Sequence, residues 1–153
     1  MKRMGIWIAM AALAGGLAAS ADGADKATAQ SLPRDSVLLL APGDISWKPT
    51  TRPGVTRAAL WGDRTVAPYG EFDRYEGGFH LPWHFHTNDL RGLIISGIWV
   101  LELRGQTAKE LPTGSYFSVP GKTPHMDTCK AGSVCVLYLT GDQPLDLIPV
   151  TPD

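Results

Sequence analysis

The stretch GGFHLPWHFHTNDLRG, Gly77 to Gly92, decides how this sequence is interpreted. It holds three of the chain's four histidines, His80, His84 and His86. The fourth, His125, ends a second patterned stretch, VPGKTPH. Successive side chains on a β-strand alternate between faces, so His84 and His86 should share a face with their Cα atoms about 6.6 Å apart. Two imidazoles at that spacing can converge on one ion, although an isolated pair could equally lie half-exposed on a solvent face. The residues that flank the pair therefore decide between a metal site and a half-exposed pair.

The N-terminus has the pattern of a secretory signal peptide. Lys2 and Arg3 precede a short apolar run that ends in Ala19-Ser20-Ala21, a small-residue cleavage site. The run is shorter than the roughly 20 residues that a spanning helix needs. We therefore expect a periplasmic or secreted protein with no stable membrane insertion after cleavage, and an uncleaved anchor is the alternative. The expected parts are a signal peptide over residues 1–21, a flexible lead-in over 22–35 and a folded domain over 36–153.

Composition narrows the class of protein further. Loss of Lys2 and Arg3 would lower the 14 basic residues to 12 against 15 acidic ones, a net charge of about −3. There is no basic run, so we expect no nucleic-acid partner. A chain of this length suits one domain with one core.

The two cysteines, Cys129 and Cys135, lie close together in the C-terminal part. In an exported protein an even pair at short spacing predicts one disulfide. The stretch between them is rich in turn-forming residues, and closing it should stabilise the fold by about 2 kcal/mol. Because Cys129 follows His125 closely, a soft metal ligand is the alternative role for that residue.

Short apolar segments separated by Gly, Pro, Asn and Asp dominate the rest of the chain and predict an all-β sandwich or barrel. The expected strands lie near Ser36–Leu40, Thr56–Trp61, Tyr69–Tyr75, His84–His86, Arg91–Ser96, Ile98–Arg104, Ser115–Val119, Val134–Thr140 and Leu145–Val150.

Two motifs with matching internal spacing resemble those of the cupin superfamily. The first is G, five residues, H-x-H, three or four residues, E, six residues, G; here Gly78, His84-Phe85-His86 and Gly97 are in register, and Leu90 stands at the Glu position. The second is G, five residues, P-x-G-x-x-H, three residues, N. Its residues here are Gly114, Pro120 and His125, with Gly121 one position early, Lys122 at the family's Gly and Cys129 in place of Asn.

The resemblance implies a double-stranded β-helix, or jelly roll, formed by a single cupin domain. It also implies that His84, His86 and His125 hold a divalent ion such as Zn, Fe, Mn or Ni. Chemistry agrees, because three imidazoles can hold a transition ion and leave coordination positions open. With Leu90 in place of Glu, three neutral ligands would leave the full dipositive charge, which favours anionic partners; a weakened site is the alternative.

Two neighbouring residues could in principle extend the site. His80 shares parity with His84 but lies about 13 Å away along an extended strand, so only a kink at Pro82-Trp83 would bring it in. We expect it at the rim or surface. Asp89, one place before Leu90, could reach the ion only if the register shifts, and such a residue more often lies in a solvated turn.

The chain looks similar to small exported bacterial cupins of unassigned function, and through them to zinc-binding cupin domains of anti-sigma factors. Some three-histidine cupins are iron dioxygenases that cleave diketones. The expected activity is therefore metal-dependent oxygenation of a small anionic or enolisable compound. A non-catalytic module that binds or senses a small molecule is the alternative. The resemblance also makes a homodimer plausible.

Overall fold

The structure, a computed structural model, describes residues 37–151 and is built almost entirely from antiparallel strands. The predicted signal peptide and lead-in fall outside this range. Within it, no helix is long and apolar enough to cross a membrane. One short 3₁₀ turn, Pro42–Asp44, precedes the strands.

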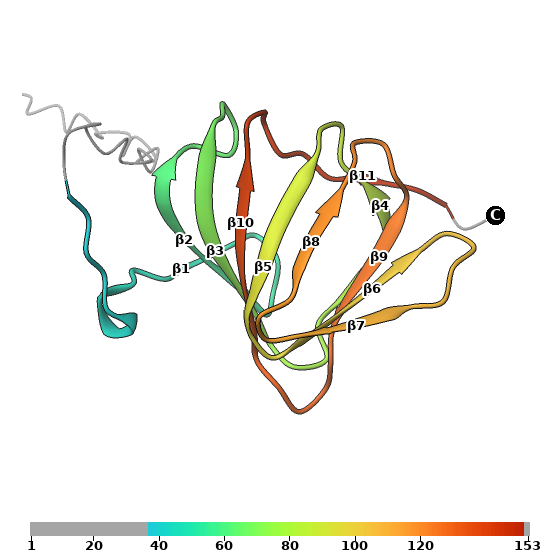
Figure 1. The fold of residues 1–153 in the computed structure, drawn as a ribbon, viewed down its shortest axis with the longest axis horizontal. Coiled ribbons are helices and arrows are strands. Elements are labelled where there is room, and N and C mark those ends of the chain that lie inside the picture. The colour runs from blue at the N-terminus through green and yellow to red at the C-terminus, as the bar shows by residue number, and fades with distance from the viewer. Residues whose placement is uncertain (1–36, 152–153) are drawn as a thin grey trace, which may run out of the picture.

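Two sheets form the domain (Figure 1). The first has the order β1-β2-β3-β10-β5-β8 and the second the order β11-β4-β9-β6-β7. The strands of the first sheet are β1 (Lys48–Pro49), β2 (Val55–Gly62), β3 (Tyr69–Tyr75), β10 (Cys135–Gly141), β5 (Leu90–Ser96) and β8 (Tyr116–Val119). Those of the second are β11 (Ile148–Pro149), β4 (His80–Phe85), β9 (His125–Cys129), β6 (Ile98–Leu103) and β7 (Lys109–Pro112). Neighbouring strands in each sheet are often distant in sequence. For example, β10 lies between β3 and β5 and pairs with both. The predicted jelly roll is confirmed.

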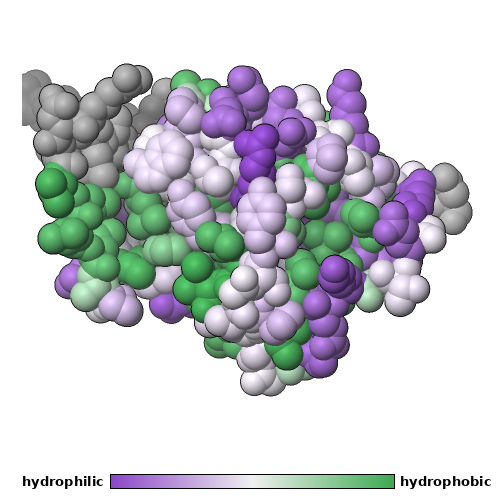
Figure 2. Space-filling view, in the orientation of Figure 1, coloured by the Kyte–Doolittle hydropathy of each residue, from purple (hydrophilic) through white to green (hydrophobic). Residues whose placement is uncertain are grey.

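The core lies between the two sheets, where alternate residues of each strand are buried. β10 shows the pattern most clearly, with every second residue from Cys135 to Gly141 buried. On β3 the same alternation buries two acidic residues, Glu71 and Asp73, between Tyr69 and Tyr75. The interior of this barrel is therefore partly polar. On the outside, Figure 2 shows apolar groups interspersed with polar ones, and the exposed apolar residues include Leu93, Ile95 and Tyr116 of the first sheet.

Most predicted strands are present within one or two residues of their expected bounds. The strand expected at Ser36–Leu40 is wrong, because residues 37–40 have no strand partner and are exposed. Leu145–Val150 is reduced to the two residues of β11. The sequence reading missed three strands, β1, β7 and β9. Of these β9 matters most, because it carries His125.

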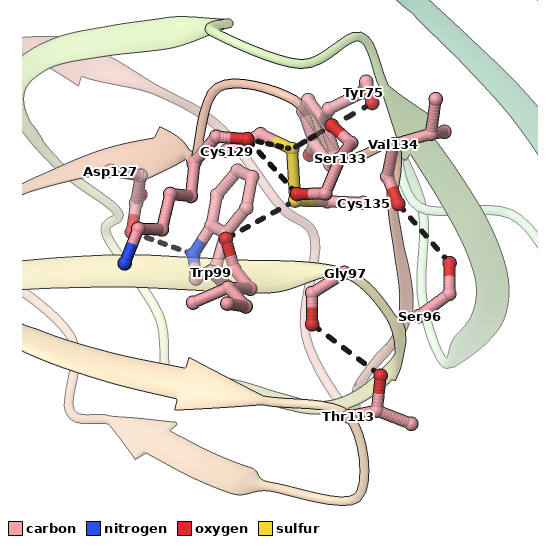
Figure 3. Close-up of a disulfide and its surroundings, with 12 residues drawn as sticks. Tyr75, Ser96, Gly97, Trp99, Thr113, Asp127, Cys129, Ser133, Val134 and Cys135 are labelled. Carbon is pink, nitrogen blue, oxygen red and sulfur yellow. Dashed lines mark hydrogen bonds between the residues drawn. A yellow bond between two sulfur atoms is a disulfide. The ribbon is translucent and has the colours of Figure 1, made fainter.

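The disulfide prediction agrees with the structure. The Sγ atoms of Cys129 and Cys135 lie 2.08 Å apart, and both residues are fully buried (Figure 3). The pair joins the end of β9 to the start of β10, which belong to different sheets. Cys129 is thus a structural crosslink and not a metal ligand.

The loop before β9 departs from the motif in a way that the backbone explains. Lys122, at the position of the family's Gly, has a φ of +64°, the left-handed region that glycine favours. Its amide donates to the carbonyl of His86 at 2.7 Å, which ties the loop to the strand end that carries the H-x-H pair. Gly121 packs against the backbone of Thr87 and Asn88, where a Cβ atom would clash.

Candidate metal centre

Three histidines meet inside the barrel. His84 lies on β4, His86 just after it and His125 at the start of β9, directly opposite His84 in the strand register. One ring nitrogen from each lies within 4.8 Å of the other two, and all three residues are buried. His84 and His86 are both buried, although the strand expected at His84–His86 begins earlier, at His80, and ends at Phe85. The structure therefore brings together the three residues that the motifs single out.

The hydrogen bonds of these imidazoles fix which nitrogen carries the proton. Nδ1 of His84 donates to the carbonyl of Pro82 at 2.8 Å, and Nδ1 of His125 donates to the carbonyl of Thr123 at 2.8 Å. Nδ1 of His86 donates to the carbonyl of Asp146 at 2.5 Å. A carbonyl only accepts, so each Nδ1 carries hydrogen and each Nε2 presents a lone pair while the ring is neutral.

Burial keeps two of these rings neutral. Burial, together with the neighbouring His125, lowers the pKa of His84 to about 4 and that of His86 to about 4. The hydrogen bonds to backbone carbonyls oppose these shifts without reversing them. Neutral imidazole is the form that binds metals, so the pair is ready for a cation across the physiological pH range.

A carboxylate that the sequence reading missed lies beside the histidines. Asp127 follows His125 by two residues on β9 and is 6% exposed. Its Oδ2 lies 3.6 Å from Nε2 of His84 and 3.6 Å from Nε2 of His125. Burial raises its pKa to about 6, against the opposing effects of His125 and a hydrogen bond from Trp99. His125-x-Asp127 repeats the i, i+2 spacing of the H-x-H pair, which is the signal that could have revealed it.

His80 lies away from the site, and the reason is a bulge. The β4–β9 register shifts between Leu81 and His84. Leu81 and His84, three residues apart, therefore both point inward, which strict alternation along a strand would not allow. His80 is exposed, and its Nδ1 meets Oγ1 of Thr128 at 3.0 Å. The parity shared by His80 and His84 in the sequence is therefore lost, and the irregularity at Pro82 turns His80 outward, not inward.

The other candidate positions are also resolved by the geometry. Asp89 is largely exposed, and its Oδ1 accepts a hydrogen bond from the amide of Gly121 at 2.9 Å. Leu90, at the family's Glu position, is buried and lines the cavity with an apolar side chain. The first sheet thus brings no carboxylate to the histidines at this position, and the nearby carboxylate comes from the second sheet.

A second polar group lies on the opposite wall, where two buried acids meet two arginines. Arg57 donates to both carboxylate oxygens of Asp73, from Nε to Oδ1 at 2.6 Å and from Nη2 to Oδ2 at 2.8 Å. Arg64 contacts Oε1 of Glu71 at 2.7 Å, and Tyr75 donates to Oδ2 of Asp73 at 3.1 Å. Burial raises the pKa of Glu71 to about 7, although both arginines oppose the shift. Each arginine thus lies within 4 Å of both acids.

One cavity of about 320 Å³ joins these groups. Its polar lining includes His86, His125, Asp127, Asp73 and Tyr75. Apolar side chains complete the walls; these are Val55, Leu81, Leu90, Trp99, Leu101, Phe117, Leu137, Leu139, Leu145 and Leu147. A concave, mostly apolar space with a few convergent polar groups is the usual form of a small-molecule site.

Comparison with solved structures identifies the fold. RemF, a polyketide cyclase from Streptomyces resistomycificus, superposes with a TM-score of 0.64 at 18% identity, over 77% of this chain and 88% of that one. An RmlC-like cupin from Shewanella frigidimarina gives 0.53 at 17% identity, over 69% and 91%. The chain has the cupin fold. KdgF from Halomonas sp. gives 0.53 at 20% identity, over 72% and 94%. No protein-family model and no curated protein sequence matches the chain.

The donor set of this cupin site suits a divalent transition ion. Imidazole nitrogen is the donor that Zn, Cu, Fe and Ni share. Among the described residues, Nε2 of His84 is a buried polar atom with no hydrogen-bond partner. Such an atom is costly unless something binds it. A cation between the three rings would satisfy it.

Proposed function

We propose that this protein is a metal-dependent oxygenase that acts on a small enolisable compound, with its divalent ion held by His84, His86 and His125. The observation that carries the proposal is the convergence of three imidazole acceptor nitrogens on one point beside a cavity of about 320 Å³. A bound ion would supply a Lewis acid for a substrate oxygen and, if it is iron, electrons for chemistry with O₂.

The chain's own residues would orient the substrate. Tyr75 and Asp73 line the cavity as a hydrogen-bonded donor and acceptor pair. Burial and the charge of Asp73 raise the pKa of Tyr75 well above its usual value, so the phenol keeps its proton. That proton is donated to Asp73, and the phenol oxygen would accept a hydrogen bond from a substrate hydroxyl. The leucine-rich walls exclude water and limit the site to a small compound.

Similarity of fold does not identify the reaction that this protein catalyses. RemF is named as a polyketide cyclase, and DMSP lyases, one of them from Ruegeria pomeroyi, share the fold at a TM-score of 0.55–0.56. One fold therefore hosts different chemistries, and the assignment must come from the site. The substrate class rests on cavity size and on an ion that binds oxygens. A periplasmic or secreted location rests on the predicted signal peptide and is supported by the cysteine pair.

Oxygen consumption tests the proposal. The protein is loaded anaerobically with ferrous iron and mixed with a panel of diketones, hydroxy acids and phenolic anions. We expect at least one compound to raise the thermal midpoint, as a ligand of the folded state does, and to trigger O₂ uptake. The His125→Ala variant should show neither effect. Conversion of a compound without O₂ uptake would replace the oxygenase by another metal-dependent enzyme. Binding without any conversion would leave a binding module.

A further inference from the structure

We infer that Asp127 is the fourth protein ligand of the ion, supplying a carboxylate through Oδ2. This inference rests on the proposed metal site and assigns a further residue to it. Asp127 is buried, and its Oδ2 lies 3.6 Å from the Nε2 atoms of both His84 and His125. It reaches the histidines because β9 places it two residues after His125, on the same inward face.

The atoms that face one another here are all acceptors. Nδ1 of each ring already donates to a backbone carbonyl, so each neutral ring turns a lone pair inward from Nε2. A carboxylate oxygen also carries only lone pairs. Buried lone pairs that face one another with no donor between them repel, and the low local dielectric strengthens the repulsion. A metal cation at their centre converts this repulsion into attraction.

The spacing of Oδ2 from the histidine nitrogens is close to that of ligands on one ion. Tetrahedral bonds of about 2.0–2.1 Å to nitrogen and oxygen place neighbouring ligand atoms about 3.3–3.4 Å apart. The separations of Oδ2 from the two Nε2 atoms exceed this by only a few tenths of an ångström. A small movement of the Asp127 side chain would bring Oδ2 to the distance that a ligand shared with His84 and His125 requires.

The other carboxylate oxygen of Asp127 is held in place by a hydrogen bond. Nε1 of Trp99 donates to Oδ1 of Asp127 at 3.0 Å, as Figure 3 shows. Trp99 is buried on the adjacent strand β6, and its ring packs on Tyr75 with 4.7 Å between centroids. Such a partner aims the free oxygen, as hydrogen bonds do for carboxylates that ligate metals. Asp127 would also lower the charge of the centre from +2 to +1.

Asp127→Asn is the decisive variant, because an amide keeps the size of the side chain and can still accept from Trp99. Its NH₂ group would point donors at the histidine nitrogens, so the protein should fold and yet bind metal poorly. In competition with a chromophoric chelator, we expect its Kd for Zn²⁺ to rise by on the order of 100-fold, the upper end for loss of a coordinating or supporting group. Trp99→Phe should raise the Kd by about tenfold. Asp89→Asn, the exposed control, should leave it unchanged.

Two further readouts separate a ligand from a merely structural residue. The visible spectrum of the Co²⁺-loaded protein should change in Asp127→Asn and stay the same in Asp89→Asn, because it reports the ligands themselves. A crystal structure of the wild-type protein with Zn²⁺ should place Oδ2 of Asp127 about 2.0 Å from the ion. That structure decides the question even if the variants do not fold.

The outcomes also separate this inference from the proposed function. If the wild-type protein binds no stoichiometric metal, the metal site itself is wrong. If it binds metal, but Asp127→Asn binds it as tightly with an unchanged Co²⁺ spectrum, or the zinc structure leaves Oδ2 beyond bonding distance, the three-histidine site stands and Asp127 is not a ligand.

Discussion

At the scale of single residues, the site depends on imidazoles that stay neutral because they are buried. His84 and His86 have pKa values of about 4 in the folded chain, against an ordinary value of 6.5. The unfolded chain therefore binds more protons than the folded one between about pH 4 and 6.5. The stability that these two rings contribute is fully present above pH 6.5 and is lost as the pH falls toward 4.

The titration of these rings gives the first prediction. In the metal-free protein, ¹⁵N NMR of the imidazoles should show His84 and His86 as neutral rings with hydrogen on Nδ1 at pH 5.5, and both should become charged only near pH 4. Assignment by His84→Gln and His86→Gln identifies the signals. Midpoints near 6.5 for both rings would mean that the pocket does not desolvate them.

Lys122 provides a second prediction at this scale, because its left-handed backbone suits glycine. A non-glycine residue in that region costs about 1–2 kcal/mol, and glycine costs about 0.5–1 kcal/mol in lost chain entropy. Lys122→Gly should therefore raise the free energy of unfolding by about 0.5–1 kcal/mol in urea denaturation.

The control for this prediction is Gly78→Ala. Gly78 has a φ of +86° and open space where a Cβ would lie, so alanine there adds strain alone. It should destabilise the protein by about 1 kcal/mol. Destabilisation by Lys122→Gly would show that the lysine side chain makes a contribution larger than the backbone strain.

At the scale of elements, β9 organises the site. Its three buried residues are His125, Asp127 and Cys129, so one strand contributes an imidazole, a carboxylate and half of the disulfide. The disulfide anchors the end of β9 to β10 in the other sheet. We infer that this crosslink supports the strand that carries the site.

The disulfide carries the third prediction. Protein purified from the export compartment should show no free thiol when denatured, and two after reduction. The Cys129→Ala/Cys135→Ala double variant should lose about 2 kcal/mol in the free energy of unfolding, because the crosslink no longer restricts the unfolded chain. Two free thiols before reduction would contradict the pairing.

β9 also shows why sequence patterns recovered most strands and not this one. Strand signals rely on apolar residues at alternate positions, as in β10. In β9 two of the three inward positions are occupied by polar residues, His125 and Asp127, because they line the site. The pattern is therefore inverted where function overrides packing. On β3 the strand was predicted, but the burial of Glu71 and Asp73 was not, because acidic residues are usually exposed. Their spacing does match that of the buried tyrosines at the two ends of the strand.

At the scale of the whole molecule, two short motifs far apart in sequence predicted both the fold and the convergence of three histidines. The histidines of the two motifs come together because β4 and β9, the strands that carry His84 and His125, are paired in one sheet. What the motifs could not predict depends on contacts across the barrel. The bulge that turns His80 outward and the arginine–acid cluster on the far wall are examples. The expectation of a fully dipositive centre considered three imidazoles alone, and Asp127 lies beside two of them.

The central claim is that His84, His86 and His125 hold one divalent ion. Metal content per chain, measured by mass spectrometry of elements after dialysis against limiting metal, tests it most directly. The account predicts about one ion per chain in the wild-type protein and in His80→Ala, and close to none in His84→Ala, His86→Ala and His125→Ala. Zinc can replace a native iron in such a measurement, because nitrogen sites bind it more tightly than ferrous iron. Equal loss of metal from His80→Ala, or full retention in any of the other three variants, would contradict the claim.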